Sequence, residues 1–114
     1  MKYMMFVVAD PAAAAEAEPS DDDLTIEEWL ADVESRGRRI TGDRLRPTSD
    51  ATTVQISKGE VLVTDGPFTE SKEWIVGFDI LDCDDLDEAI SIAARHPQAN
   101  GGKLELRPFM TPED

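Results

Sequence analysis

The chain has 114 residues and a formal net charge of −14, because 25 acidic side chains outnumber 11 basic ones. This length suits one domain that spans residues 1–114, with a core of modest size. The charge argues against nucleic-acid binding, which needs a basic surface, and against docking on anionic membranes. One histidine and one cysteine are too few for a histidine- or cysteine-based metal site. We therefore expect an acidic protein that uses no metal or other cofactor.

The N-terminal segment is predicted to be a strand followed by an acidic connection. Residues 2–9 are apolar on both faces after the first residue, which is typical of a buried strand. Residues 10–23 are acidic, contain two prolines and can form a helical turn at the alanines. The apolar run is too short to cross a bilayer, and it lacks the pattern of a signal peptide. We therefore expect a cytoplasmic location.

The first long helix is predicted over residues 25–36. Thr25 and Glu28 have the spacing of a capping box, and Gly37 suits the position just after a helix end. The apolar residues at helical spacing form one stripe, which consists of Ile26, Trp29, Leu30 and Val33. Residues 38–46 then include an extended segment.

The centre of the chain is predicted to form strands. Residues 52–57 and 60–64 are rich in β-branched side chains, and Lys58-Gly59 between them is typical of a hairpin turn. Residues 74–81 form a strong strand. The apolar side chains expected on one face of this strand are Trp74, Val76, Phe78 and Ile80.

The C-terminal part is predicted to be a helix and a last strand. The helix begins at Asp85, with a second capping-box pattern, and stops at Pro97. Residues 103–109 alternate, so that Glu105 and Arg107 share one face. The whole order predicts a ferredoxin-like α+β domain, in which two helices cover one face of an antiparallel sheet.

The second face of this sheet also needs a cover. Residues 3–8 and 74–81 are apolar on both faces, so we expect an identical sheet from a second copy to cover the open face. The alternative is that the 10–23 connection covers it within one chain. Charge is segregated, since residues 1–34 carry ten acids and one base, whereas 36–46 carry five arginines and one acid. These blocks can pair within or between subunits, or simply form solvated faces.

One segment combines a strand end, a turn and charged residues. Asp65 continues an apolar strand face, and Gly66-Pro67 forces a turn directly after it. With Lys72 and Glu73 nearby in sequence, the Asp65 carboxylate is a candidate for proton transfer or ligand binding. The alternative is that this carboxylate only accepts hydrogen bonds from the backbone of its own turn.

This segment resembles the signature of the DGPF-motif proteins in the YCII-related family. The resemblance is carried by Asp65-Gly66-Pro67-Phe68, by the Thr69–Glu73 segment that follows and by Gly77-Phe78. Further similarity extends over the whole chain except residues 10–24. It includes Tyr3-Met4-Met5, Gly42, Leu45, Ala51–Val54, Asp85–Ala89 and Glu105–Pro108.

The resemblance implies a dimeric α+β barrel, in which two ferredoxin-like units bring their sheets together. Small-molecule sites in that superfamily lie between sheet and helices or inside the barrel. YCII-related proteins are suspected enzymes because of a histidine–aspartate pair, and DGPF-motif members are associated with extracytoplasmic-function sigma factors. In this chain Trp29 and Leu30 occupy the region of the first helix where the YCII-type histidine stands. The resemblance therefore brings no settled reaction, and it leaves Asp65 without its histidine partner.

Two further groups have a structural and a functional interpretation. His96, at the end of the second helix, is interpreted as a cap or surface residue whose cationic form interacts with the helix dipole, with a functional role as the alternative. Glu105 and Arg107 can form an ion pair at a sheet edge, or reach Asp65 or Lys72 across the sheet to make a polar cluster.

Two functions follow as hypotheses. The first is a homodimer that binds a small molecule or a protein partner, with a link to sigma-factor-dependent regulation and no contact with DNA. Its acidic surface suits a basic protein partner. The alternative is a cofactor-independent enzyme of the proton-transfer, lyase or isomerase type. In that enzyme Asp65 is the acid or base, and the substrate is oriented by Lys72, Glu73, Glu105 or Arg107.

Overall fold

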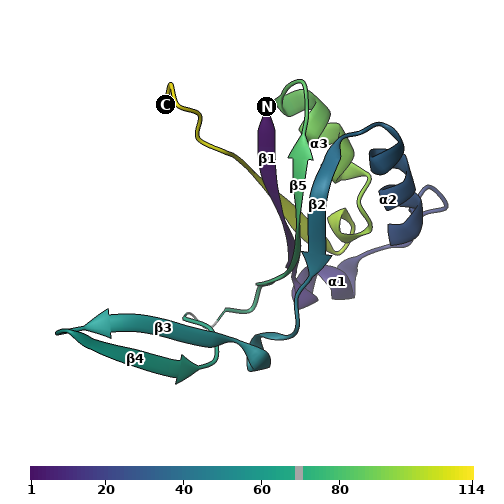
Figure 1. Cartoon of the computed structure of the whole chain (residues 1–114). Coiled ribbons are helices and arrows are strands. Elements are labelled where there is room, and N and C mark those ends of the chain that lie inside the picture. The colour runs from purple at the N-terminus through teal and green to yellow at the C-terminus, as the bar shows by residue number, and fades with distance from the viewer. Residues whose placement is uncertain (69–70) are drawn as a thin grey trace.

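A computed structural model describes residues 1–68 and 71–114, and it is an α+β structure with antiparallel sheets (Figure 1). The six strands are β1 (Lys2–Ala9), β2 (Arg39–Arg44), β3 (Thr52–Ser57), β4 (Glu60–Asp65), β5 (Trp74–Asp82) and β6 (Gly102–Pro108). The helices are α1 (Pro11–Glu16), α2 (Ile26–Ser35) and α3 (Leu86–Ala94), with short 3₁₀ turns η1 (Thr48–Asp50) and η2 (Pro97–Ala99). The predicted elements are therefore present, in the predicted order.

Four strands form the main sheet, in the order β2-β5-β1-β6, and every neighbouring pair is antiparallel. Helices α2 and α3 lie on one face of this sheet (Figure 1). The core lies between them and centres on the fully buried Trp29 and Tyr3. The indole N–H of Trp29 donates to the Ile92 carbonyl over 2.9 Å, which ties α2 to α3.

The predicted capping boxes fix the start of both long helices. At α2, Thr25 accepts the Glu28 amide at 3.1 Å, while the Glu28 carboxylate accepts the Thr25 amide at 3.0 Å. At α3, Asp85 accepts the Glu88 amide at 2.8 Å. The Glu88 carboxylate instead accepts the amide of Asp84, one residue earlier than the capping-box pattern predicts.

A β-bulge corrects the predicted faces of β5. Val7 pairs with Gly77 but Val8 pairs with Ile75, so Val76 is the extra residue. Val76 consequently packs against the helix-side core, and Ile75 is 43% exposed. The prediction that Val76 shares a face with Phe78 is therefore wrong, because a strict period of two does not continue through a bulge.

Strands β3 and β4 form a separate two-stranded sheet, which we call the arm. The arm extends away from the main sheet (Figure 1). Cross-strand pairing puts four apolar side chains on one of its faces, each between 62% and 72% exposed: Val54, Ile56, Val61 and Val63. An isolated two-stranded hairpin is marginally stable in water, so this face needs a partner.

The acidic connection lies beside β6 and η2 and does not cover the open sheet face. Its alanines form α1, with Asp10 as the N-cap. Further along, the Asn100 side chain donates to the Glu18 carbonyl over 2.9 Å, and Gly101 lies against Ala14. The alternative cover predicted for the second sheet face is therefore wrong for the described chain.

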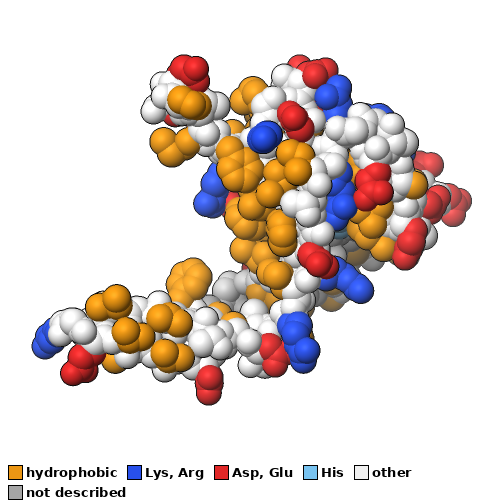
Figure 2. Space-filling view, viewed as in Figure 1, with side chains coloured by type: hydrophobic (Ala, Val, Ile, Leu, Met, Phe, Trp, Pro, Cys, Tyr) orange, Lys and Arg blue, Asp and Glu red, His pale blue; other side chains and the backbone are white. Residues whose placement is uncertain are grey.

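The open face of the main sheet is apolar. Its half-buried apolar side chains come from β1 and β5, namely Met4, Phe6, Val8, Phe78 and Ile80. Figure 2 shows hydrophobic side chains gathered here, in a hollow bounded by the C-terminal tail and the arm. Arg107 lies over the Phe6 ring, 5.5 Å from its centre. Within the described chain, this face has no covering layer.

Candidate functional site

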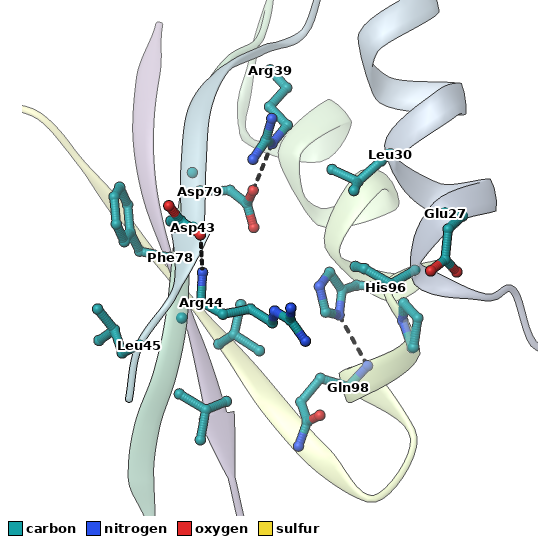
Figure 3. Close-up of a pocket in the computed structure, with 16 residues that line it drawn as sticks. Glu27, Leu30, Arg39, Asp43, Arg44, Leu45, Phe78, Asp79, His96 and Gln98 are labelled. Atoms are coloured by element: carbon teal, nitrogen blue, oxygen red, sulfur yellow. Dashed lines mark hydrogen bonds and ion pairs between the residues drawn. The ribbon is translucent and has the colours of Figure 1, made fainter. Parts of the chain in front are cut away.

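A pocket lies between the main sheet and α2 (Figure 3). Its volume is about 590 Å³. The sheet wall comes from β2 and β5, the second wall from the first turns of α2, and the end from η2. A pocket of this size and position suits a small organic molecule.

A buried ion pair forms part of the sheet wall. Arg39 on β2 donates to the Asp79 carboxylate of β5 over 2.7 Å, and also pairs with Glu34 at 3.0 Å. Burial raises the pKa of the Asp79 carboxyl above its ordinary value, and the hydrogen bond and charge of Arg39 partly offset that effect. Because Glu34 and Asp79 share it, the charge of Arg39 is largely neutralised.

Gly42 makes room for this ion pair. It pairs with Asp79 across the β2–β5 ladder. A Cβ atom at this position would overlap the Asp79 carboxylate and come 2.5 Å from the carbonyl oxygen of Phe78. The glycine therefore lets the carboxylate lie flat against β2, where Arg39 reaches it.

His96 closes the helix side of the pocket. It is 7% exposed, and its ring meets the Trp29 ring edge-on with centroids 4.7 Å apart. Its Nδ1 accepts the Gln98 amide at 2.9 Å, so the ring proton resides on Nε2. Burial lowers the pKa of His96 to about 4. The predicted surface position and cationic form are therefore wrong, because the imidazole is buried and neutral at neutral pH; His96 does act as a cap, at the start of η2.

Arg44 is an arginine of the pocket that forms no ion pair with the described residues. Figure 3 shows its side chain extending from β2 across the pocket, towards His96 and Gln98. Among the described residues, its guanidinium has no carboxylate within ion-pair distance, and only its backbone amide is hydrogen-bonded, to Asp43. The remaining walls include apolar side chains of Ile26, Leu30, Val76 and Pro97. The pocket thus combines apolar walls with hydrogen-bond donors.

The predicted site residues lie elsewhere. Asp65 is exposed at the end of β4, opposite Thr52 in the arm, and Lys72 is also exposed. Asp65 therefore does not share a sheet with Glu105 or Arg107, because β4 belongs to the arm. In the motif, Thr69 and Glu70 lie outside the described residues.

The other predicted residues form exposed ion pairs. Glu105 and Arg107 pair with each other over 2.8 Å on edge strand β6, which is the structural interpretation made from the sequence. Glu73 pairs with Lys103 over 2.7 Å. The carboxylates of Glu73 and Asp10 raise the pKa of Lys103 above its ordinary value. These contacts tie β6 to the segments that flank β1 and β5.

His96 was singled out from the sequence, with a functional role as the alternative, but the other pocket residues were missed because they come from separate elements. One signal was available at Asp79, which follows Gly77 and precedes Leu81 on the buried side of an otherwise apolar strand. A carboxylate in that position needs a cationic partner, and the arginine block was the obvious source. The sequence contained no comparable indication that Arg44 would line the pocket without an ion-pair partner.

The described part of the chain lacks two kinds of feature. Within residues 1–68 and 71–114, no three His, Cys, Asp or Glu side chains are grouped so that they could hold a metal ion. None of the described helices has the length and hydrophobicity needed to cross a membrane.

Comparison with known families agrees with the motif in the sequence. The model of the YCII-related domain matches residues 1–111, which is nearly the whole chain. The chain belongs to the YCII-related family. An uncharacterised protein of Rhizobium meliloti (strain 1021) is 48% identical over 68 residues, which cover 58% of this chain and 55% of that protein. This YCII-related chain therefore spans little more than half the length of that relative.

Proposed function

We propose that this YCII-related protein is a homodimeric small-molecule-binding protein, and that its ligand occupies the pocket between β2, β5, α2 and η2. The observation that carries this proposal is the pocket itself. Its volume is about 590 Å³, and it combines apolar walls with the side chains of Arg44 and His96. Both side chains have N–H donors without a hydrogen-bond partner among the described residues. Apolar walls with a few converging polar groups are typical of ligand sites.

The charge states in the pocket favour binding over acid–base catalysis. A general base works best when its pKa lies near the operating pH. The pKa of His96 is lowered to about 4, so its ring is a weak base at neutral pH. Asp79 is held by Arg39 at 2.7 Å. The alternative prediction of an enzyme that uses Asp65 gains no support from the position of Asp65, which is exposed on the arm.

Two features support the proposed assembly. The strand order β2-β5-β1-β6, with helices on one face, is the order of a ferredoxin-like fold when the arm is set aside. The open sheet face and the apolar face of the arm then offer a surface for a second copy, as in a dimeric α+β barrel. Such a dimer covers the apolar side chains that one described chain leaves open.

The proposed partners and location rest on the family resemblance and on the net charge. The link to a sigma factor comes from the family resemblance alone and remains a prediction, as does the cytoplasmic location. A net charge of −14 supports a basic protein partner and argues against nucleic acid and anionic membranes. A ligand pocket would give such a regulator a small-molecule input.

A variant that fills the pocket tests the proposed site. Leu30 lines the pocket from α2, whereas the adjacent Ala31 is exposed. We expect calorimetry to detect binding of benzoate or benzamide to the wild type. We expect Leu30→Trp to weaken that binding at least tenfold, because the indole takes up the ligand's space, and the matched Ala31→Trp to change it less than twofold. Far-ultraviolet circular dichroism checks that both variants fold. Failure of both probes to bind, or equal binding by the two variants, would contradict the proposal.

A further inference from the structure

We propose that the pocket selects small organic acids, with Arg44 binding the carboxylate or phosphate group and the apolar walls binding the rest of the molecule. This inference rests on the proposed function, because it specifies the ligand of the same pocket. Its evidence is the arrangement of charge around Arg44.

Arg44 is exceptional among the arginines of this chain. Each of the others has a carboxylate within 4.0 Å in the described structure, namely Arg36, Arg38, Arg39, Arg46, Arg95 and Arg107. In a chain with 25 acidic residues, a guanidinium has many potential ion-pair partners. Arg44 instead lines the pocket and extends across it while staying accessible to solvent (Figure 3). A planar guanidinium with five N–H donors suits an oxyanion with two acceptor atoms.

The backbone explains why the Arg44 side chain points inward. Arg44 pairs with Gly77 across the β2–β5 ladder, on the same side of the sheet as the Gly42–Asp79 pair. That side faces the helices, because Asp79 is buried there. Gly77 and Arg44 both line the pocket.

A second donor faces the same space. His96 Nδ1 is occupied by the Gln98 amide, so Nε2 carries the proton. Nε2 has no hydrogen-bond partner among the described residues. It is also not fully buried, because every fully buried side-chain nitrogen or oxygen in the described structure has a partner. His96 lines the pocket, so this N–H is available to a ligand there. Figure 3 shows the ring opposite the sheet wall, with the Arg44 side chain between them.

The acidic groups around the pocket do not cancel Arg44. Asp79 is matched by Arg39 at 2.7 Å. Asp43 pairs with Phe78, so its side chain belongs to the opposite side of the sheet from Arg44, and its carboxylate accepts the Arg44 amide at 2.8 Å. Glu27 is exposed on the first turn of α2, at the rim. Of the acidic residues that line the pocket, Asp79 is therefore ion-paired, Asp43 belongs to the other side of the sheet, and Glu27 is exposed to solvent.

The apolar walls define the rest of the ligand. Ile26, Leu30, Val76 and Pro97 surround the space that Arg44 enters. A free inorganic anion would leave these walls without contact, whereas an aromatic or aliphatic acid fills them. Carboxylate and phosphate share the chemistry that Arg44 recognises, and the probes below separate them.

Three nearly isosteric probes test the charge preference by calorimetry at low ionic strength. Benzoate is anionic, benzamide neutral and benzamidine cationic, while phenyl phosphate replaces the carboxylate by a phosphate. We expect wild-type protein to bind benzoate at least tenfold more tightly than benzamide, with benzamidine weakest. A charge-assisted bidentate contact accounts for a difference of this size. Whichever of benzoate and phenyl phosphate binds more tightly identifies the anionic group.

The matched variants are Arg44→Gln and Arg46→Gln. Arg46 is the neighbouring arginine that pairs with Asp50 and lies outside the pocket. We expect Arg44→Gln to abolish the preference for benzoate over benzamide, and Arg46→Gln to leave that preference unchanged. Equal binding of benzoate and benzamide, tighter binding of benzamidine, or an unchanged preference in Arg44→Gln would overturn this inference while leaving the proposed site intact. Failure of every probe to bind would instead overturn the proposed function.

Discussion

Gly42 and Gly77 determine what the sheet wall of the pocket can hold. The space beside Gly42 admits the Asp79 carboxylate. At Gly77 a Cβ atom would come 3.0 Å from the carbonyl oxygen of Asp43, so this glycine permits the close approach of β5 to β2. The two arginines of the wall then differ in role, because Arg39 neutralises Asp79 while Arg44 has no such partner in the described structure.

His96 makes the stability of the protein depend on pH. Its pKa is about 4 in the folded chain and about 6.5 in the unfolded chain, so the unfolded state binds more protons between these values. The free energy of unfolding therefore falls as the pH falls through this window. We expect His96 to account for a loss of about 2 kcal/mol between pH 7.5 and pH 5, since 1 pKa unit corresponds to about 1.4 kcal/mol.

The matched variant for this effect is His96→Asn, which keeps an acceptor for the Gln98 amide. Urea unfolding at both pH values measures the loss, and the contribution of Asp79 is common to both proteins. The variant should lose about 2 kcal/mol less than the wild type over this interval. Equal losses in the two proteins would contradict a buried, neutral His96.

Residue-level prediction from the sequence succeeded where a residue acts on its own neighbourhood. Thr25 caps its helix as predicted, because a capping box depends on residues three positions apart. The pocket depends on Arg39, Asp79 and His96, which are far apart in sequence and meet only after the sheet has formed. Their meeting could not be predicted from local spacing.

At the scale of elements, the central hairpin also shows that local sequence patterns do not predict how distant parts of the chain meet. The β-branched runs and Lys58-Gly59 predicted both strands and their turn, and Lys58 has a φ of 51° that suits such a turn. Local alternation does not specify which sheet a strand joins. The separate arm could therefore not be predicted from the sequence. Because β4 belongs to the arm, Asp65 lies in a different sheet from Glu105 and Arg107.

The open face of the main sheet carries a prediction about assembly. Ile80 lies on this face and Ile90 is exposed on α3, so Ile80→Asp and Ile90→Asp form a matched pair. Burying an unpaired carboxylate in an interface is costly, and a carboxylate on the outer face of a helix is not. We expect only Ile80→Asp to dissociate the dimer.

Multi-angle light scattering at micromolar protein concentration measures the mass of each variant in solution and so shows whether it is a dimer. The wild type and Ile90→Asp should have twice the 12.6 kDa mass of one chain, and Ile80→Asp should have the single mass. A wild-type mass of 12.6 kDa would contradict the proposed dimer. A dimeric Ile80→Asp would place the interface elsewhere.

At the scale of the whole molecule, a strongly acidic chain contains a pocket that is lined by one arginine without a carboxylate partner among the described residues. The net charge of −14 comes from many exposed carboxylates, most of which serve as helix caps, ion-pair partners or solvated groups. Long-range attraction therefore does not bring an anion to this protein, and short-range contacts in the pocket must hold it. We expect recognition to depend on shape and on Arg44 rather than on overall charge.

The position of bound benzoate is the most direct test of the proposed function. Amide chemical shifts in ¹H–¹⁵N correlation spectra, followed during a benzoate titration, measure it. We predict the largest changes on β2, on the first turns of α2 and around His96 and Gln98. The largest changes at Asp65–Phe68 and Lys72-Glu73, or no saturable change at any residue, would contradict a ligand pocket between the sheet and α2.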